Sequence, residues 1–149
     1  VVPSVGRRAT VAQLRAASGV RVLHLATHTG LSARGPWLAL SDGVLGADQI
    51  LSESLAGGLV VLAGCASAVP EGHGMWGSLG AAFLSAGSES VLGTLWSVDD
   101  RSTHLALSRF YEESGATNPA RGLARAQRAL IDGGQPPSAW APFVVFGSR

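Results

Sequence analysis

The sequence contains a single cysteine and no lysine. Cys65 is that cysteine among 149 residues, so an internal disulfide is excluded, and no group of Cys and His has the spacing of a zinc site. All eleven basic residues are arginines, which we attribute to genomic composition. A lone cysteine is usually a small buried hydrophobic residue. Cys65 therefore needs further context before it can be considered a nucleophile.

Charge is also scarce, because charged residues make up 14% of the chain and the net charge is +1. Such a balance gives no reason to expect a nucleic-acid or membrane partner. The longest uncharged stretch, Ser54 to Pro70, is interrupted by glycines and too short to span a bilayer. No basic segment is followed by an apolar run, as in a signal peptide. We expect a cytoplasmic protein whose N-terminus lies upstream of Val1.

Three short apolar runs predict the core of a sheet. They cover residues 22–26, 59–63 and 90–96, and each is apolar on both faces, which is typical of buried parallel strands with helices on either side. A fourth run, Phe143 to Phe146, is a candidate for a further strand. With 46% apolar residues, the chain has the composition of one globular domain. The sequence predicts a single α/β domain with a mainly parallel sheet.

Helices are predicted between these runs, with Asp100 or Ser102 as the N-cap of the fourth. The last helix is predicted to have Asn118 as its N-cap, Pro119 as its first residue and glycines after its end. A hairpin is predicted to turn at Asp42-Gly43, between Trp37–Leu40 and Val44–Leu45. The five predicted helices are Thr10–Ala17, Ala47–Ser54, Met75–Ala86, Thr103–Glu113 and Asn118–Ile131.

Two of the predicted strands are followed by residues with catalytic potential. His28 comes after the first run and Cys65 after the second. Because functional groups gather beyond the carboxyl ends of parallel strands, we expect the two side chains at one edge of the sheet. A histidine next to a cysteine generates the thiolate that attacks a carbonyl. Backbone N–H groups in the turns at Thr29-Gly30 and Gly64-Cys65 could stabilise the resulting oxyanion.

Several alternatives stay open on spacing alone. Cys65 could be an inert residue at the end of a strand, and His28 could be simply hydrogen-bonded. A metal pair of His24 and His28 on one strand face lacks a third ligand with suitable spacing. A serine hydrolase is not indicated, since no Gly-x-Ser-x-Gly turn follows a strand. The remaining candidates are interpreted as surface or packing residues: His73, His104, Arg121, Arg125 and Arg128.

Five blocks of sequence resemble the CHAT family, a group of caspase-like peptidases related to caspases, metacaspases and separases. The blocks occur in the family's order and spacing from about Val22 onwards. They are LHLATHTG, LVVLAGCASA, GAAFLSAGSESVLGTLWSVDDRST, RFYE and WAPFVVFG.

The resemblance implies a caspase-like three-layer α/β/α fold in which His28 matches the family histidine and Cys65 the nucleophile. Thr29 stands where the family typically has glycine, so the N–H of Thr29 or of Gly30 would join that of Cys65 in binding the oxyanion. Gly64 stands where the family usually has alanine. Family domains carry further strands before the histidine strand. We therefore expect residues 1–149 to form one domain that lacks its N-terminal strands and is the C-terminal part of a longer protein.

The function implied by the resemblance is that of a cysteine endopeptidase acting on proteins or peptides, without cofactor or metal. Asp99 and Asp100 are candidates for a pocket that receives a basic substrate residue, Asp100 being favoured because one of the two is expected to cap a helix. An upstream domain or a regulatory partner protein is also expected. The alternatives are a catalytically silent interaction module of the same fold and a flavodoxin-like ligand-binding domain. The latter lacks a glycine-rich phosphate loop after its first strand.

Overall fold

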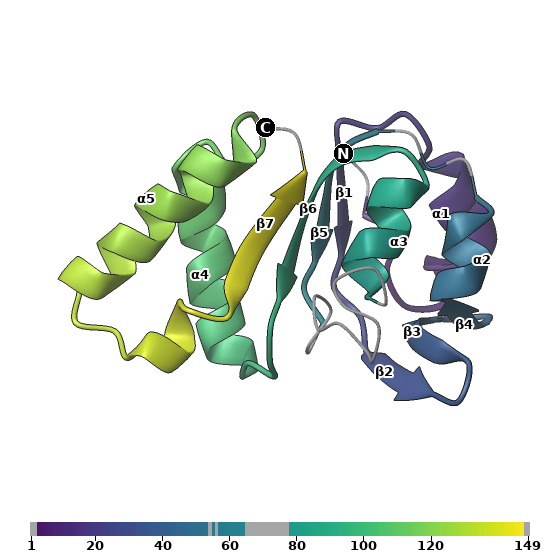
Figure 1. Cartoon of the computed structure of the whole chain (residues 1–149), viewed down its shortest axis with the longest axis horizontal. Coiled ribbons are helices and arrows are strands. Elements are labelled where there is room, and N and C mark those ends of the chain that lie inside the picture. The colour runs from purple at the N-terminus through teal and green to yellow at the C-terminus, as the bar shows by residue number, and fades with distance from the viewer. Residues whose placement is uncertain (1–2, 54, 56, 65–77, 148–149) are drawn as a thin grey trace.

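The computed structural model describes residues 3–53, 55, 57–64 and 78–147, which form two sheets and flanking helices (Figure 1). The α-helices are α1 (Val11–Ala16), α2 (Ala47–Leu51), α3 (Leu79–Ser85), α4 (Asp100–Glu112) and α5 (Pro119–Asp132). Short 3₁₀ helices cover Gly6–Arg8 and Pro137–Ala139. The strands are β1 (Val22–Leu25), β2 (Thr29–Ser32), β3 (Gly35–Leu40), β4 (Gly43–Gly46), β5 (Gly57–Leu62), β6 (Ser88–Thr94) and β7 (Phe143–Gly147).

The larger sheet has the strand order β1-β5-β6-β7. Strands β1, β5 and β6 run parallel, and β7 pairs antiparallel with β6. The four apolar runs of the sequence correspond to these four strands. The prediction of a mainly parallel sheet is confirmed, and so is the fourth strand.

Helices cover both faces of this sheet. Successive side chains of a strand point to opposite faces, so each central strand contributes to the core on both sides. Val60 and Leu62 of β5 belong to a core shared with α1, α2 and α3. Leu59 and Val61 belong to a second core, shared with α4 and α5. Figure 1 shows the two groups of helices on opposite sides of the sheet. The predicted α/β/α arrangement is therefore confirmed.

The smaller sheet is an antiparallel β2-β3-β4 unit inserted between β1 and β5. The predicted hairpin is confirmed, but it turns at Ser41 and Asp42, because Gly43 already pairs with Leu40 as the first residue of β4. Strand β2 was not predicted. The Asp42 carboxylate also accepts hydrogen bonds from the backbone N–H of Val11, at 3.1 and 3.3 Å. This contact fastens the turn to the start of α1, since the first N–H groups of a helix have no partner within it.

The start of α4 differs from the prediction. The helix begins at Asp100, and its N-cap is Asp99, whose carboxylate accepts a hydrogen bond from the N–H of Ser102 at 2.9 Å. The prediction of Asp100 or Ser102 as the cap is wrong, whereas the expectation that one of Asp99 and Asp100 caps the helix is confirmed. The features expected for α5 are confirmed: Asn118 caps it, Pro119 is its first residue, and Gly134 beyond its end has a φ of 70°. In the described ranges, none of the helices combines the length and apolar character that crossing a membrane requires.

Candidate functional site

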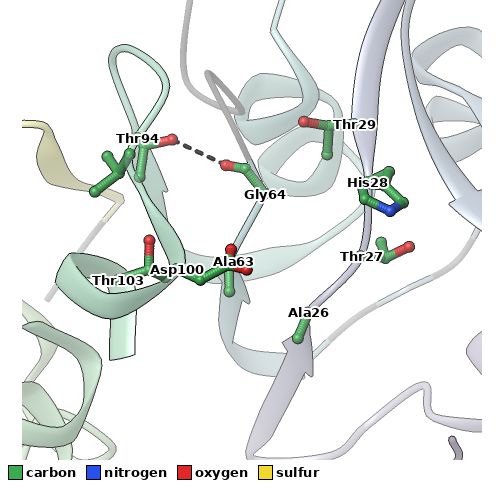
Figure 2. Close-up of a pocket in the computed structure, with 10 residues that line it drawn as sticks. Ala26, Thr27, His28, Thr29, Ala63, Gly64, Thr94, Asp100 and Thr103 are labelled. Carbon is green, nitrogen blue, oxygen red and sulfur yellow. Dashed lines mark hydrogen bonds between the residues drawn. The ribbon is translucent and has the colours of Figure 1, made fainter. Parts of the chain in front are cut away.

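A cavity of about 370 Å³ lies at the carboxyl ends of β1, β5 and β6 (Figure 2). Its volume is near the lower end of the range for ligand pockets. Three segments supply its described lining, namely the turn after β1, the end of β5, and the segment from the end of β6 into α4. The lining residues are Ala26, Thr27, His28, Thr29, Ala63, Gly64, Thr94, Val98, Asp100 and Thr103.

His28 lines this cavity from the turn between β1 and β2. Its side chain is exposed, whereas its backbone is fixed, because its carbonyl accepts a hydrogen bond from the N–H of Ala39 at 2.9 Å. The Thr27 hydroxyl donates to the carbonyl of the same Ala39 at 2.6 Å. Two bonds to one residue of β3 thus hold the turn. The smaller sheet therefore fixes the backbone position of His28 beside the cavity.

Gly64, the residue before Cys65, is packed too tightly to carry a side chain. A Cβ at this position would lie 2.6 Å from the Thr29 methyl group and 2.8 Å from the Thr27 carbonyl oxygen. Both separations are far shorter than van der Waals contact. The methyl group of Thr29 therefore lies where an alanine side chain at position 64 would need space. The two positions at which we expected departures from the family pattern are thus in close contact.

We therefore expect Gly64→Ala to destabilise the protein by about 1–3 kcal/mol, the usual cost of overpacking. The cost should be smaller in a Thr29→Ser background, which removes the methyl group and leaves the hydroxyl. A double-mutant cycle measured by urea unfolding should give a coupling free energy of about 0.5 kcal/mol or more.

Gly80→Ala is the matched control for this cycle. A Cβ on Gly80 in α3 would meet no atom closer than 3.6 Å, so alanine should stabilise the helix by about 0.5–1 kcal/mol. Additive effects of Gly64→Ala and Thr29→Ser would show that the two positions do not interact.

The pairing of β2 with β3 distinguishes the two candidate oxyanion donors in this turn. The bond from Ala39 N–H to the His28 carbonyl makes Thr29 and Leu38 a non-hydrogen-bonded pair. In such a ladder the next pair, Gly30 and Trp37, is the hydrogen-bonded one, so the N–H of Gly30 points at β3. The Thr29 N–H points to the opposite side. Gly30 also lacks space for a Cβ because the Trp37 indole covers it. Packing against Trp37 therefore explains why position 30 is a glycine.

Asp100 lines the cavity from the first turn of α4, and Thr103 lines it from one turn further on. Asp99 is not among the described lining residues, since its carboxylate caps the helix. Hydrogen bonds from the Ser102 side chain and backbone N–H lower the pKa of the Asp99 carboxyl group. Of the described lining residues, His28 and Asp100 are the titratable ones.

His24 lies apart from His28 and contacts α4. Its Nδ1 is 2.8 Å from the Tyr111 hydroxyl, and the two rings stack with centroids 5.8 Å apart. Burial lowers the pKa of His24 and raises that of Tyr111. The expectation that His24 and His28 share a strand face is wrong, because β1 ends at Leu25. Within the described ranges, no group of three His, Cys, Asp or Glu side chains could hold a metal ion.

The structure brings His28, Thr29, Gly64 and Asp100 together around one cavity. Cys65 itself, its backbone N–H and His73 lie outside the described residues. The sequence did not identify six of the described lining residues, and all six lie in blocks that resemble the family. They are Ala26, Thr27, Ala63, Thr94, Val98 and Thr103. A threonine at the end of an apolar run was the available signal for Thr94.

The profile of the CHAT domain matches residues 1–148 of this chain. A search of curated proteins finds no match.

Proposed function

The chain belongs to the CHAT domain family, a family of caspase-like peptidases, and from this premise we propose that it is a cysteine endopeptidase whose catalytic dyad is His28 and Cys65. The observation that carries the proposal is the cavity in Figure 2. It has His28 on one wall and Gly64 on another, and Cys65 is bonded directly to Gly64. A histidine and the residue next to the cysteine thus face the same space.

In the proposed reaction the Cys65 thiolate attacks the carbonyl carbon of the scissile peptide bond, and a carbon–sulfur bond forms. His28 holds the thiol proton and donates it to the leaving amine as the carbon–nitrogen bond breaks. A thioester remains. Water then adds to it with His28 as the general base, which releases the carboxylic acid and restores the thiol.

The negative charge on the carbonyl oxygen requires N–H donors during both steps. The proposed donors are the backbone N–H groups of Cys65 and Thr29. Support for Thr29 over Gly30 comes from the ladder alternation, since the Gly30 N–H points at β3. Thr29 belongs to the cavity lining, and Gly30 is not among the described lining residues.

A preference for a basic residue before the scissile bond completes the proposal. Asp100 is the one carboxylate among the described lining residues, and a guanidinium group can pair with a carboxylate through two parallel hydrogen bonds. Asp100 also lies in the first turn of α4, at the end of the helix where acidic side chains are generally favourable for helix stability.

Labelling with a peptidyl electrophile tests the dyad against the alternative of a silent interaction module. We expect a peptidyl chloromethyl ketone ending in arginine to modify the wild-type protein once, at Cys65, as read by mass spectrometry of its peptides. Labelling should disappear in Cys65→Ala and slow strongly in His28→Ala. A folded wild-type protein that reacts no faster than a free thiol would favour the silent module.

We also propose that a segment upstream of residue 1 completes the larger sheet by pairing with β1. Support comes from the strand order, in which β1 occupies an edge, and an edge strand offers unpaired N–H and C=O groups to another strand. A chain extended upstream should cleave peptides faster than residues 1–149 alone. Equal turnover of the two chains would contradict this.

A further inference from the structure

Thr94 is a buried polar residue at the end of β6, on the wall of the cavity. Its exposed fraction is 2%, and its hydroxyl donates a hydrogen bond to the Gly64 carbonyl at 2.9 Å. The ladder between β5 and β6 pairs residues as far as Val61 with Leu92. The Thr94 hydroxyl therefore joins the two strands again beyond the last of these backbone pairs, at the residue that precedes Cys65.

Thr94 is itself rigidly placed. Its backbone pairs with Phe143 of β7, and Phe143 is buried with 2% of its surface exposed. The next residue, Leu95, donates its N–H to the Pro142 carbonyl at 2.9 Å. Pairing with β7 therefore fixes the end of β6, and with it the position of the Thr94 hydroxyl.

Gly64 is confined from the opposite side as well. The Thr29 side chain and the Thr27 carbonyl occupy the space where a Cβ would be. Figure 2 shows Gly64 between Thr94 and Thr29, with the hydrogen bond to Thr94 dashed. The carbonyl of Gly64 thus accepts a hydrogen bond from Thr94, while the side chain of Thr29 packs closely against its Cα.

We propose that Thr94 is a positioning residue for the reaction, because its hydroxyl fixes the plane of the peptide bond between Gly64 and Cys65. A peptide unit is planar, so anchoring its C=O also fixes the direction of its N–H. That N–H is the proposed oxyanion donor of Cys65. The inference rests on the proposed function, and it assigns to Thr94 the task of aiming this donor.

Thr94→Val and Thr94→Ser test the inference together. Valine keeps the shape and removes the hydroxyl, and we expect kcat for a peptide substrate to fall about 10- to 100-fold with little change in KM, somewhat less than for complete loss of an oxyanion donor. Serine keeps the hydroxyl and should restore kcat to near the wild-type value. Alkylation of Cys65 by iodoacetamide forms no oxyanion, so its rate and pH profile should be the same in all three proteins.

Ser88→Ala is the matched control. Ser88 lies at the other end of β6, is also buried, and donates its hydroxyl to the Leu55 carbonyl at 3.4 Å. Ser88→Ala also removes a buried hydroxyl group, but one that is remote from the described lining of the cavity. The substitution should therefore leave kcat unchanged. A fall in kcat equal to that of Thr94→Val would overturn the inference, because the loss would then reflect general destabilisation.

Other outcomes would also overturn it. These are an unchanged kcat in Thr94→Val, a Thr94→Ser variant as slow as Thr94→Val, or an equal loss of alkylation rate. If the folded wild-type protein cleaves no peptide, the proposed function fails, and urea unfolding tests the anchor by itself. Thr94→Val leaves the buried Gly64 carbonyl without its hydrogen bond, so its unfolding midpoint should fall below that of Thr94→Ser. Equal midpoints for the two variants would refute the anchor.

Discussion

Replacing either His28 or Cys65 by alanine should lower the rate of peptide cleavage by a factor of about 10³ or more. The members of a nucleophile–base unit act together, so the loss of one removes most of the rate enhancement of both. His28 has an exposed side chain beyond the end of β1, and we expect its removal to cost only about 1 kcal/mol of stability. The measurement is kcat/KM on a fluorogenic peptide, with the melting temperature recorded for each variant.

His104→Ala provides the matched histidine control. His104 is exposed on α4 and does not belong to the described lining of the cavity, so its loss should leave cleavage unchanged. Cys65→Ser tests whether sulfur itself is required, since serine keeps the size of the side chain and is a much weaker nucleophile. Wild-type rates in Cys65→Ala would refute the dyad, whatever the behaviour of the His28 variant.

The larger sheet could be predicted because its strands carry their signal locally. The runs that form β1, β5 and β6 are apolar on both faces, and such runs are typical of strands buried between two layers of helices. Strand β2, at Thr29–Ser32, escaped prediction because its four residues show neither an apolar run nor β-branched enrichment. Its strand character comes from pairing with β3 across the turn before Gly35.

The start of α4 was mispredicted for a related reason. Asp99, Asp100 and Ser102 are all residues that cap helices well, so the local pattern favours several starting points equally. The fold selects Asp99, whose carboxylate reaches the N–H of Ser102. That choice leaves Asp100 inside the first turn and on the cavity wall.

His28 and Asp100 could be selected as candidates from the sequence because each follows an apolar run of the sheet. The close contact between Thr29 and Gly64 could not be predicted, because it depends on two segments that meet only in the folded chain. The same holds for Thr94. Threonine is common in strands, and only the pairing of β5 with β6 brings its hydroxyl to a carbonyl that lies far away in the sequence.

The electrostatics of the cavity make Asp100 the residue on which substrate preference should depend. Its carboxylate is the one acidic group of the described lining, and it lies on the first turn of a helix anchored by Asp99. Hydrogen bonds to a charged partner contribute about 1.5–3 kcal/mol. Since each 1.4 kcal/mol corresponds to a factor of ten, the loss of one such contact should lower kcat/KM by about 10- to 100-fold.

We therefore expect Asp100→Asn and Asp100→Ala to lower kcat/KM for peptides with arginine before the scissile bond, and to leave peptides with a neutral residue there nearly unaffected. Asp99→Ala is the matched control: it removes a neighbouring carboxylate and a helix cap, which should cost about 1 kcal/mol of stability without changing the preference. A positional-scanning peptide library, read on the upstream-extended chain, compares all four proteins. If Asp100 binds the guanidinium group of the substrate, its replacement by alanine must change the order of preference. A preference for aspartate or large apolar residues that is the same in the wild type and in Asp100→Ala would therefore show that this carboxylate does not contact the substrate.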